Sequence, residues 1–220
     1  MNLFIRTAGI SAAVLFITGT ANAASMSYFL DQSNDLADGV NYAKVTIDDE
    51  GAVGDINFTV EVLVSAFPTP ISMQAFGMQT FSFNYDDALD LPAGNISKSN
   101  IVNINPGSWK ILEDKNAGGD FGKFEFQATG NGITRTEILT FSISGVVGDT
   151  IASYATGKDA EIGSEYFAAH IAGYADSVSG NTSGKFAGST AVPVPAAAWL
   201  FGSGLIMLGG MMRRKAASSQ

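Results

Sequence analysis

The chain has 220 residues with 12 basic and 21 acidic side chains, a net charge of −9 at pH 7, and no cysteine. Binding to phosphates requires clustered Lys and Arg, so this acidic balance argues against nucleic acid or an anionic membrane surface as a partner of the body. Without cysteine, neither disulfides nor thiolate chemistry contributes, and a secreted form must be stabilised by its hydrophobic core.

The first 23 residues have the pattern of a secretory signal peptide. A basic start that includes Arg6 is followed by an apolar stretch over residues 8–18, and Ala21 and Ala23 form an A-x-A cleavage site. Such a segment is removed after export. We therefore expect residues 1–23 to engage the Sec export machinery and signal peptidase, and the mature chain to begin at Ala24.

Residues 24–176 contain repeated alternation of apolar and polar side chains. In residues 56–64 every second side chain is apolar, which is the period of a half-buried strand. Similar patterns occur in residues 40–47, 81–85, 124–126, 139–143, 166–174 and, further on, 185–188. Glycine-rich turn signals separate these segments. The pattern predicts one all-β domain, an antiparallel β-sandwich with a jelly-roll or immunoglobulin-like layout.

His170 is the only histidine, which excludes a His-based catalytic triad or a multi-histidine metal site. On an alternating strand it would share one face with Tyr166, Ala168, Ala172 and Tyr174. We interpret it as a half-buried, hydrogen-bonded structural imidazole, with a general base as the alternative.

Two acidic clusters lie beside turn signals, residues 48–50 and the group of Asp86, Asp87 and Asp90. Carboxylate oxygens suit calcium, but neither cluster has the spacing of a calcium loop. We interpret both as solvated turns and expect no metal and no cofactor. Trp109 has the chemistry for sugar stacking but is interpreted as a core residue. No nucleophile elbow, phosphate-binding loop or recognisable carboxylate pair indicates an enzyme.

The C-terminal part has the organisation of a membrane anchor. Residues 177–191 are rich in Ser, Gly, Asn and Thr and are expected to form a flexible linker. The apolar residues 196–212 would form a helix of about 25 Å, the lower limit for spanning a bilayer. Arg213, Arg214 and Lys215 follow, so a transmembrane helix would leave the tail, residues 216–220, in the cytoplasm. A plain anchor and a buried helical hairpin are the alternatives.

Before this apolar run stand Val192, Pro193, Val194 and Pro195, and the run itself begins Ala-Ala-Ala-Trp-Leu-Phe-Gly-Ser-Gly-Leu. From residue 192 to residue 215 the segment resembles the PEP-CTERM sorting signal of Gram-negative bacteria. The resemblance implies recognition by exosortase, a membrane-embedded transpeptidase-like cysteine enzyme. The family's glutamate between the prolines is Val194 here, so no role of that carboxylate is carried over.

These features predict an exported, non-enzymatic protein. It would be held transiently in the inner membrane and then processed for the cell surface or the extracellular matrix of a biofilm. The alternative is a secreted carbohydrate-binding module, with exopolysaccharide as its partner and with or without the help of calcium. A hydrolase would need a constellation of side chains that the sequence does not display.

Overall fold

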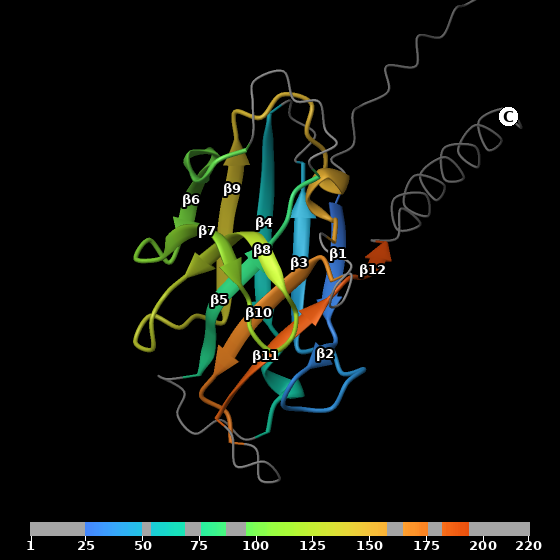
Figure 1. Cartoon of the computed structure of the whole chain (residues 1–220), viewed down its shortest axis with the longest axis vertical. Helices are drawn as coiled ribbons and strands as arrows, with labels where there is room; N and C mark the ends of the chain where they lie inside the picture. Colours follow the sequence, from blue (N-terminus) through green and yellow to red (C-terminus); the bar gives the residue numbers. More distant parts are fainter. Residues whose placement is uncertain are drawn as a thin grey trace, which may run out of the picture.

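The computed structural model describes residues 25–49, 54–68, 76–86, 96–157, 165–175 and 182–193. This part of the chain is built mostly from β-strands, which form two antiparallel sheets of six strands each (Figure 1). The all-β, antiparallel fold class predicted from the alternating pattern is therefore confirmed.

Sheet A contains both terminal strands of the described fold. Its order is β12-β1-β3-β4-β9-β6, and neighbouring strands are antiparallel throughout. The strands are β12 (Thr190–Pro193), β1 (Ser25–Leu30), β3 (Ala43–Asp48), β4 (Asp55–Val62), β9 (Ile138–Ser144) and β6 (Ile101–Asn105).

Sheet B has the order β2-β11-β10-β5-β8-β7. Its strands are β2 (Gln32–Ser33), β11 (Ser183–Gly188), β10 (Phe167–Ala172), β5 (Gly77–Phe83), β8 (Lys123–Thr129) and β7 (Lys110–Asn116). Three short 3-10 helices complete the described elements, η1 (Val64–Ala66), η2 (Lys98–Asn100) and η3 (Ile151–Tyr154).

Aromatic side chains join the two sheets into one core. Phe58 of β4 stacks on Phe141 of β9 within sheet A, with ring centroids 4.6 Å apart, and it also lies 5.3 Å from the ring of Phe83 in sheet B. Alternate residues of β4 are buried and the others are more exposed, as its period of two predicts. The two sheets therefore pack face to face, in a β-sandwich-like arrangement.

Five strands were not expected from the sequence, namely β1, β2, β6, β7 and β12. β7 has the sequence KILEDKN, and most of its side chains are exposed, so it carries no alternating apolar signal. β2 has only two residues. The positions of these five strands are determined by hydrogen bonding to neighbouring strands. The periodicity of side chains along the sequence does not reveal such bonding.

The flexible linker expected at residues 177–191 is wrong in its described part, while the strand pattern noted at residues 185–188 is confirmed by β11. Residues 183–188 form β11, between β2 and β10, and residues 190–193 form β12. The small residues are required by close packing: a Cβ at Gly188 would overlap Phe29 O and lie 2.9 Å from Leu30 Cα. Gly and Ser were interpreted as signs of flexibility, but here they allow two backbones to approach. The domain therefore extends beyond the predicted boundary at residue 176, to Pro193.

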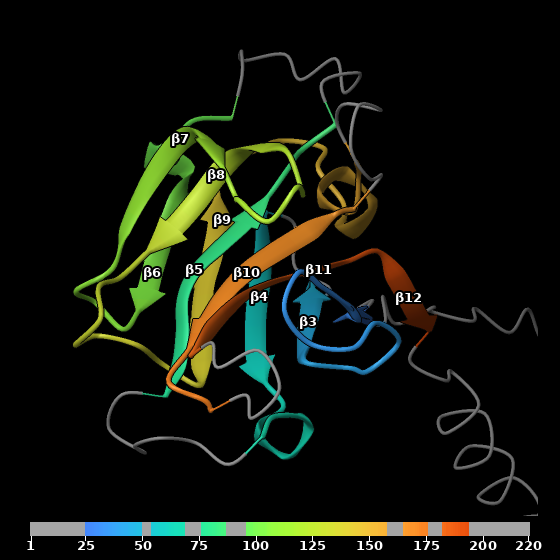
Figure 2. The ribbon, with the colours of Figure 1, turned by 60° about the horizontal axis from the view of Figure 1, so that its bottom comes forward.

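The two ends of the described fold form one continuous ladder. β1 pairs with β12 in the register Phe29↔Thr190, and β2 pairs with β11 in the register Gln32↔Ala187. Both pairings have the same register, so the ladder runs from sheet A into sheet B and bends near Asp31 and Gly188. Figure 2 shows the chain passing from β11 to β12 at one side of the molecule. This terminal ladder, residues 26–33 paired with residues 186–193, closes that side of the two-layered body.

Candidate functional site

The first half of the predicted sorting motif belongs to a strand. Val192 lies opposite Ser27, and Pro193 lies opposite Met26. β12 is the outermost strand of sheet A, and among the described strands its only neighbour in the sheet is β1. Proline donates no backbone hydrogen bond and is found in sheets chiefly on edge strands, where Pro193 lies. The other predicted sorting residues, Val194, Pro195, Arg213, Arg214 and Lys215, and the cleavage residues Ala21, Ala23 and Ala24, lie outside the described residues.

The start of β1 and the end of β12 lie at the same end of sheet A. Because the two strands are antiparallel and Met26 faces Pro193, the described body begins and ends at neighbouring positions. Ser25 itself pairs with Asp48, the last residue of β3. Asp48 is therefore next to the position where the described body begins and ends.

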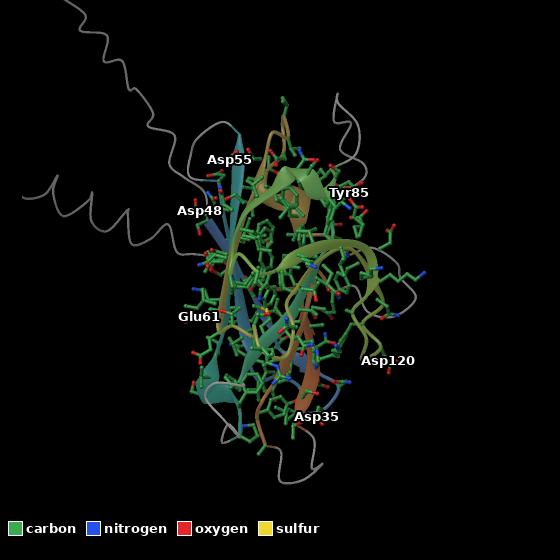
Figure 3. The ribbon with its side chains drawn as sticks, turned by 90° about the vertical axis from the view of Figure 1, so that its left-hand side faces the viewer. Asp35, Asp48, Asp55, Glu61, Tyr85 and Asp120 are labelled. Carbon is green, nitrogen blue, oxygen red and sulfur yellow. The ribbon has the colours of Figure 1, made fainter. Side chains whose placement is uncertain are left out.

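Carboxylates gather at this end of sheet A. Asp49, Asp55 and Asp149 line a cavity of about 470 Å³ together with the loop of residues 145–148. A second cavity of about 260 Å³ is lined by Ser25, Met26, Asp49 and residues of η3, among others. Figure 3 shows Asp48 and Asp55 near each other at this end of the molecule. We call the carboxylates Asp48, Asp49, Asp55 and Asp149 the acidic end.

Within the acidic end, the surroundings of Asp149 shift the pKa of its carboxyl group. Burial raises the pKa of its carboxyl group, and the negative charge of Asp55 raises it further, while a hydrogen bond from the Tyr154 hydroxyl lowers it. That hydroxyl donates to Asp149 Oδ2 over 2.6 Å. Burial and the neighbouring carboxylate raise the pKa of Tyr154 as well. The pair therefore keeps its proton on the phenol at neutral pH.

The acidic end does not form a metal site in the described residues. No group of three or more His, Cys, Asp or Glu side chains in the described ranges is placed to hold a metal ion. Of the two acidic clusters singled out in the sequence, Glu50, Asp87 and Asp90 fall outside those ranges. Asp86 is described, and its backbone N–H donates to Ser153 O. The sequence did not suggest Asp55 or Asp149, because each is an isolated acidic residue beside a glycine.

His170 lies on the outer face of sheet B, opposite Lys185 of β11 and Thr80 of β5. Its pKa is lowered to about 4, first by burial and then by the positive charges of Lys185 and Arg135. The ring is therefore neutral at neutral pH. The predicted half-buried position is confirmed, and its hydrogen bonding stays a prediction.

The shared face predicted for residues 166–174 is wrong at Tyr174. This side chain is fully buried, its ring packs against Phe67 and Phe186, and its hydroxyl donates to Asp35 Oδ2 over 2.7 Å. Gly173 has a φ of 93°, a left-handed conformation that interrupts the strand. The alternation of inward and outward side chains is therefore broken between His170 and Tyr174, so Tyr174 does not share the face of His170.

The turn between β7 and β8 covers part of the outer face of sheet B. Gly118 and Gly119 approach the aliphatic stem of Lys185, and a Cβ at Gly119 would lie 2.9 Å from Lys185 Cγ. Phe124 and Ala117 pack there against Ala168 and Ala187. This cover helps to explain why burial lowers the pKa of the Lys185 ammonium.

Trp109 is buried with 4% of its surface exposed, and its indole Nε1 donates to Thr134 O over 2.8 Å. Its interpretation as a core residue is confirmed, so it offers no face for sugar stacking. Glu165, which the sequence did not single out, is 7% exposed and accepts a hydrogen bond from Gln32 Nε2. Nothing in its local sequence distinguishes it from a surface carboxylate.

Comparison of the chain with protein-family models, with curated proteins and with solved structures found no match. Within the residues that the structure describes, no helix has the length and apolar character needed to cross a membrane. The predicted span, residues 196–212, lies outside them.

Proposed function

We propose that this protein is an exported, non-enzymatic surface or matrix protein of a Gram-negative bacterium, sorted by an exosortase-type transpeptidase through its C-terminal segment. The observation that carries the proposal is the pairing of β1 with β12. The body begins with Ser25, beside the predicted signal cleavage site, and ends with Pro193, inside the predicted sorting motif. It thus occupies the stretch expected to remain after both ends are processed.

The geometry also supports a short connection to the membrane. Only Val194 and Pro195 separate the end of β12 from the predicted helix at residues 196–212. Two extended residues span about 7 Å. Before cleavage, the tether would therefore keep the body close to the periplasmic surface of the inner membrane, with the acidic end nearest to it, although the charge of the body does not favour binding to that surface.

A structural or adhesive role fits the side chains better than catalysis does. The single histidine has two cationic neighbours that oppose its protonation, and Asp149 is hydrogen-bonded to Tyr154. A general acid or base needs a proton that can be exchanged near the working pH. The pKa of His170, about 4, lies well below neutral pH, so this ring is not tuned for that task.

The test is mass spectrometry of the mature protein isolated from a host that carries exosortase. We expect an N-terminus at Ala24 and a C-terminus that lacks Arg213, Arg214 and Lys215. A paired comparison tests the motif: Pro193→Ala combined with Pro195→Ala should leave uncut protein in the inner membrane, because Ala in place of Pro lets the helix extend backward. Val194→Ala is the matched control and should be processed. Normal cleavage of the double variant would contradict the proposed motif.

A second candidate function is binding of a polysaccharide, and the cavity at the acidic end favours it. A cavity of about 470 Å³ is lined there by carboxylates and glycine-rich loops. The carboxylate oxygens can accept hydrogen bonds from the hydroxyl groups of a sugar. A glycan array with and without a chelator tests this function and separates direct from calcium-assisted binding. An Asp55→Asn, Asp149→Asn variant with unchanged glycan binding would exclude this cavity as the site.

A further inference from the structure

We propose that β12 must separate from β1 before the sorting enzyme can cut, so that the terminal ladder controls cleavage. The inference rests on the proposed sorting function and adds a step of regulation to it. In the folded body the backbone of residues 190–193 is paired with β1, and this stretch includes Val192 and Pro193 of the motif.

An enzyme that cuts a peptide bond binds its substrate as an extended segment inside a cleft, with main-chain hydrogen bonds to the segment. A strand that is already part of a sheet has one edge occupied. Cleavage of folded proteins therefore proceeds through local opening, and its rate follows the population of the open form when reclosing is fast. Here β1 occupies the inner edge of β12.

The chain outside the ladder is too short to serve as the substrate alone. Val194 and Pro195 span about 7 Å before the predicted helix begins. A cleft that recognises the whole Val-Pro-Val-Pro motif must also take Val192 and Pro193, which the folded body holds in β12.

β12 can open without unfolding the rest of the body. It is a four-residue edge strand with one neighbour, and Thr190 contributes one side-chain bond, from its hydroxyl to Asp31 Oδ2 over 3.0 Å. β11, in contrast, is bonded on both sides, and Gly188 is packed tightly against Phe29 and Leu30. Opening that starts at Pro193 is therefore expected to stop at Ser189.

A reversible cross-link tests this inference, because the chain contains no cysteine of its own. Phe29 and Thr190 lie directly opposite each other on β1 and β12 and outside the motif. The Cα atoms of directly opposite residues on antiparallel strands lie about 4.5–5.5 Å apart, within the range that a disulfide spans. We expect the oxidised Phe29→Cys, Thr190→Cys variant to be cut at least about tenfold more slowly than the parent, and the reduced form to be cut at the parental rate or faster.

The matched control is a cross-link between two other strands of sheet A, at residues in line with Phe29 across the sheet. Lys44 and Glu61 lie opposite each other on β3 and β4, and Lys44 also faces Phe29. The oxidised Lys44→Cys, Glu61→Cys variant should be cut at the parental rate. A Thr190→Val variant, which loses the bond to Asp31, should be cut a few-fold faster. Thermal unfolding of each variant establishes that the body is folded.

Each outcome has a distinct meaning. If the parent chain is not cut, the proposed function fails and this inference fails with it. If the parent is cut and the oxidised Phe29→Cys, Thr190→Cys variant is cut equally fast, the motif is read on the intact strand, and only this inference is overturned. Equal slowing of the control cross-link would also overturn it, because general stiffening would then explain the effect.

Discussion

At the scale of single residues, His170 affects how stability depends on pH. Its pKa is about 4 in the folded chain, below the ordinary value of 6.5, so the unfolded chain binds more protons between these two values. Its contribution to stability is complete above pH 6.5 and is lost as the pH falls toward 4. We expect His170→Gln, which stays neutral, to flatten this part of the stability curve, measured by urea unfolding at several pH values.

The control for this prediction is the same measurement on the parent chain, and activity or ligand binding should not change in the variant. His170→Ala should cost about 1–2 kcal/mol of unfolding free energy, since packing is lost as well. An unchanged pH profile of stability in His170→Gln would contradict the burial and charge effects assigned to this ring.

Tyr154 and Asp149 form a second residue-scale test. Tyr154 is fully buried, and its hydroxyl donates to a carboxylate. Hydrogen bonds to charged groups contribute about 1.5–3 kcal/mol, and partial exposure of Asp149 favours the lower value. We expect Tyr154→Phe to lower the unfolding free energy by about 1.5 kcal/mol at neutral pH and by less once Asp149 is protonated. Tyr166→Phe, in a partly exposed side chain, is the control and should change stability by under about 0.5 kcal/mol.

At the scale of elements, the bend of the terminal ladder depends on Gly188. Any side chain there would overlap the backbone of β1. We expect Gly188→Ala to destabilise the body by about 3 kcal/mol or more, measured by thermal unfolding. Gly107 is the matched control, because a Cβ there would meet only Ile104 O at 3.9 Å. If Gly188→Ala unfolds at the same temperature as the Gly107→Ala control and the parent, Gly188 is not packed against the backbone of β1.

At the scale of the whole molecule, the predicted basic stop should determine where the protein is found. Replacing Arg213, Arg214 and Lys215 with Gln would remove roughly 3 kcal/mol of attraction to the cytoplasmic leaflet, at about 1 kcal/mol per charge. We expect unsorted protein to leak into the medium, measured by fractionation and immunoblotting. Replacement of Lys123, Lys110 and Lys115 by Gln removes the same charge from the body and should leave sorting unchanged. Parental retention and processing of the tail variant would show that the basic cluster is not part of the signal.

The amino-acid sequence by itself determined the features that depend on neighbouring residues. The apolar side chains of β4 and β9 alternate because adjacent residues of a strand face opposite sides, so burial can be read from the local pattern. The predictions of a signal peptide, of a sorting motif and of a basic stop are local in the same way.

Only the tertiary structure decided the features that bring distant residues together. β12 pairs with β1 although the two strands lie at opposite ends of the body's amino-acid sequence. Asp149 and Asp55, which are also far apart in the sequence, line the same cavity. Residues 183–193 have the composition of a linker, yet they form strands because small side chains let two backbones meet. Such contacts depend on the packing of the whole chain, which no local pattern of side chains encodes.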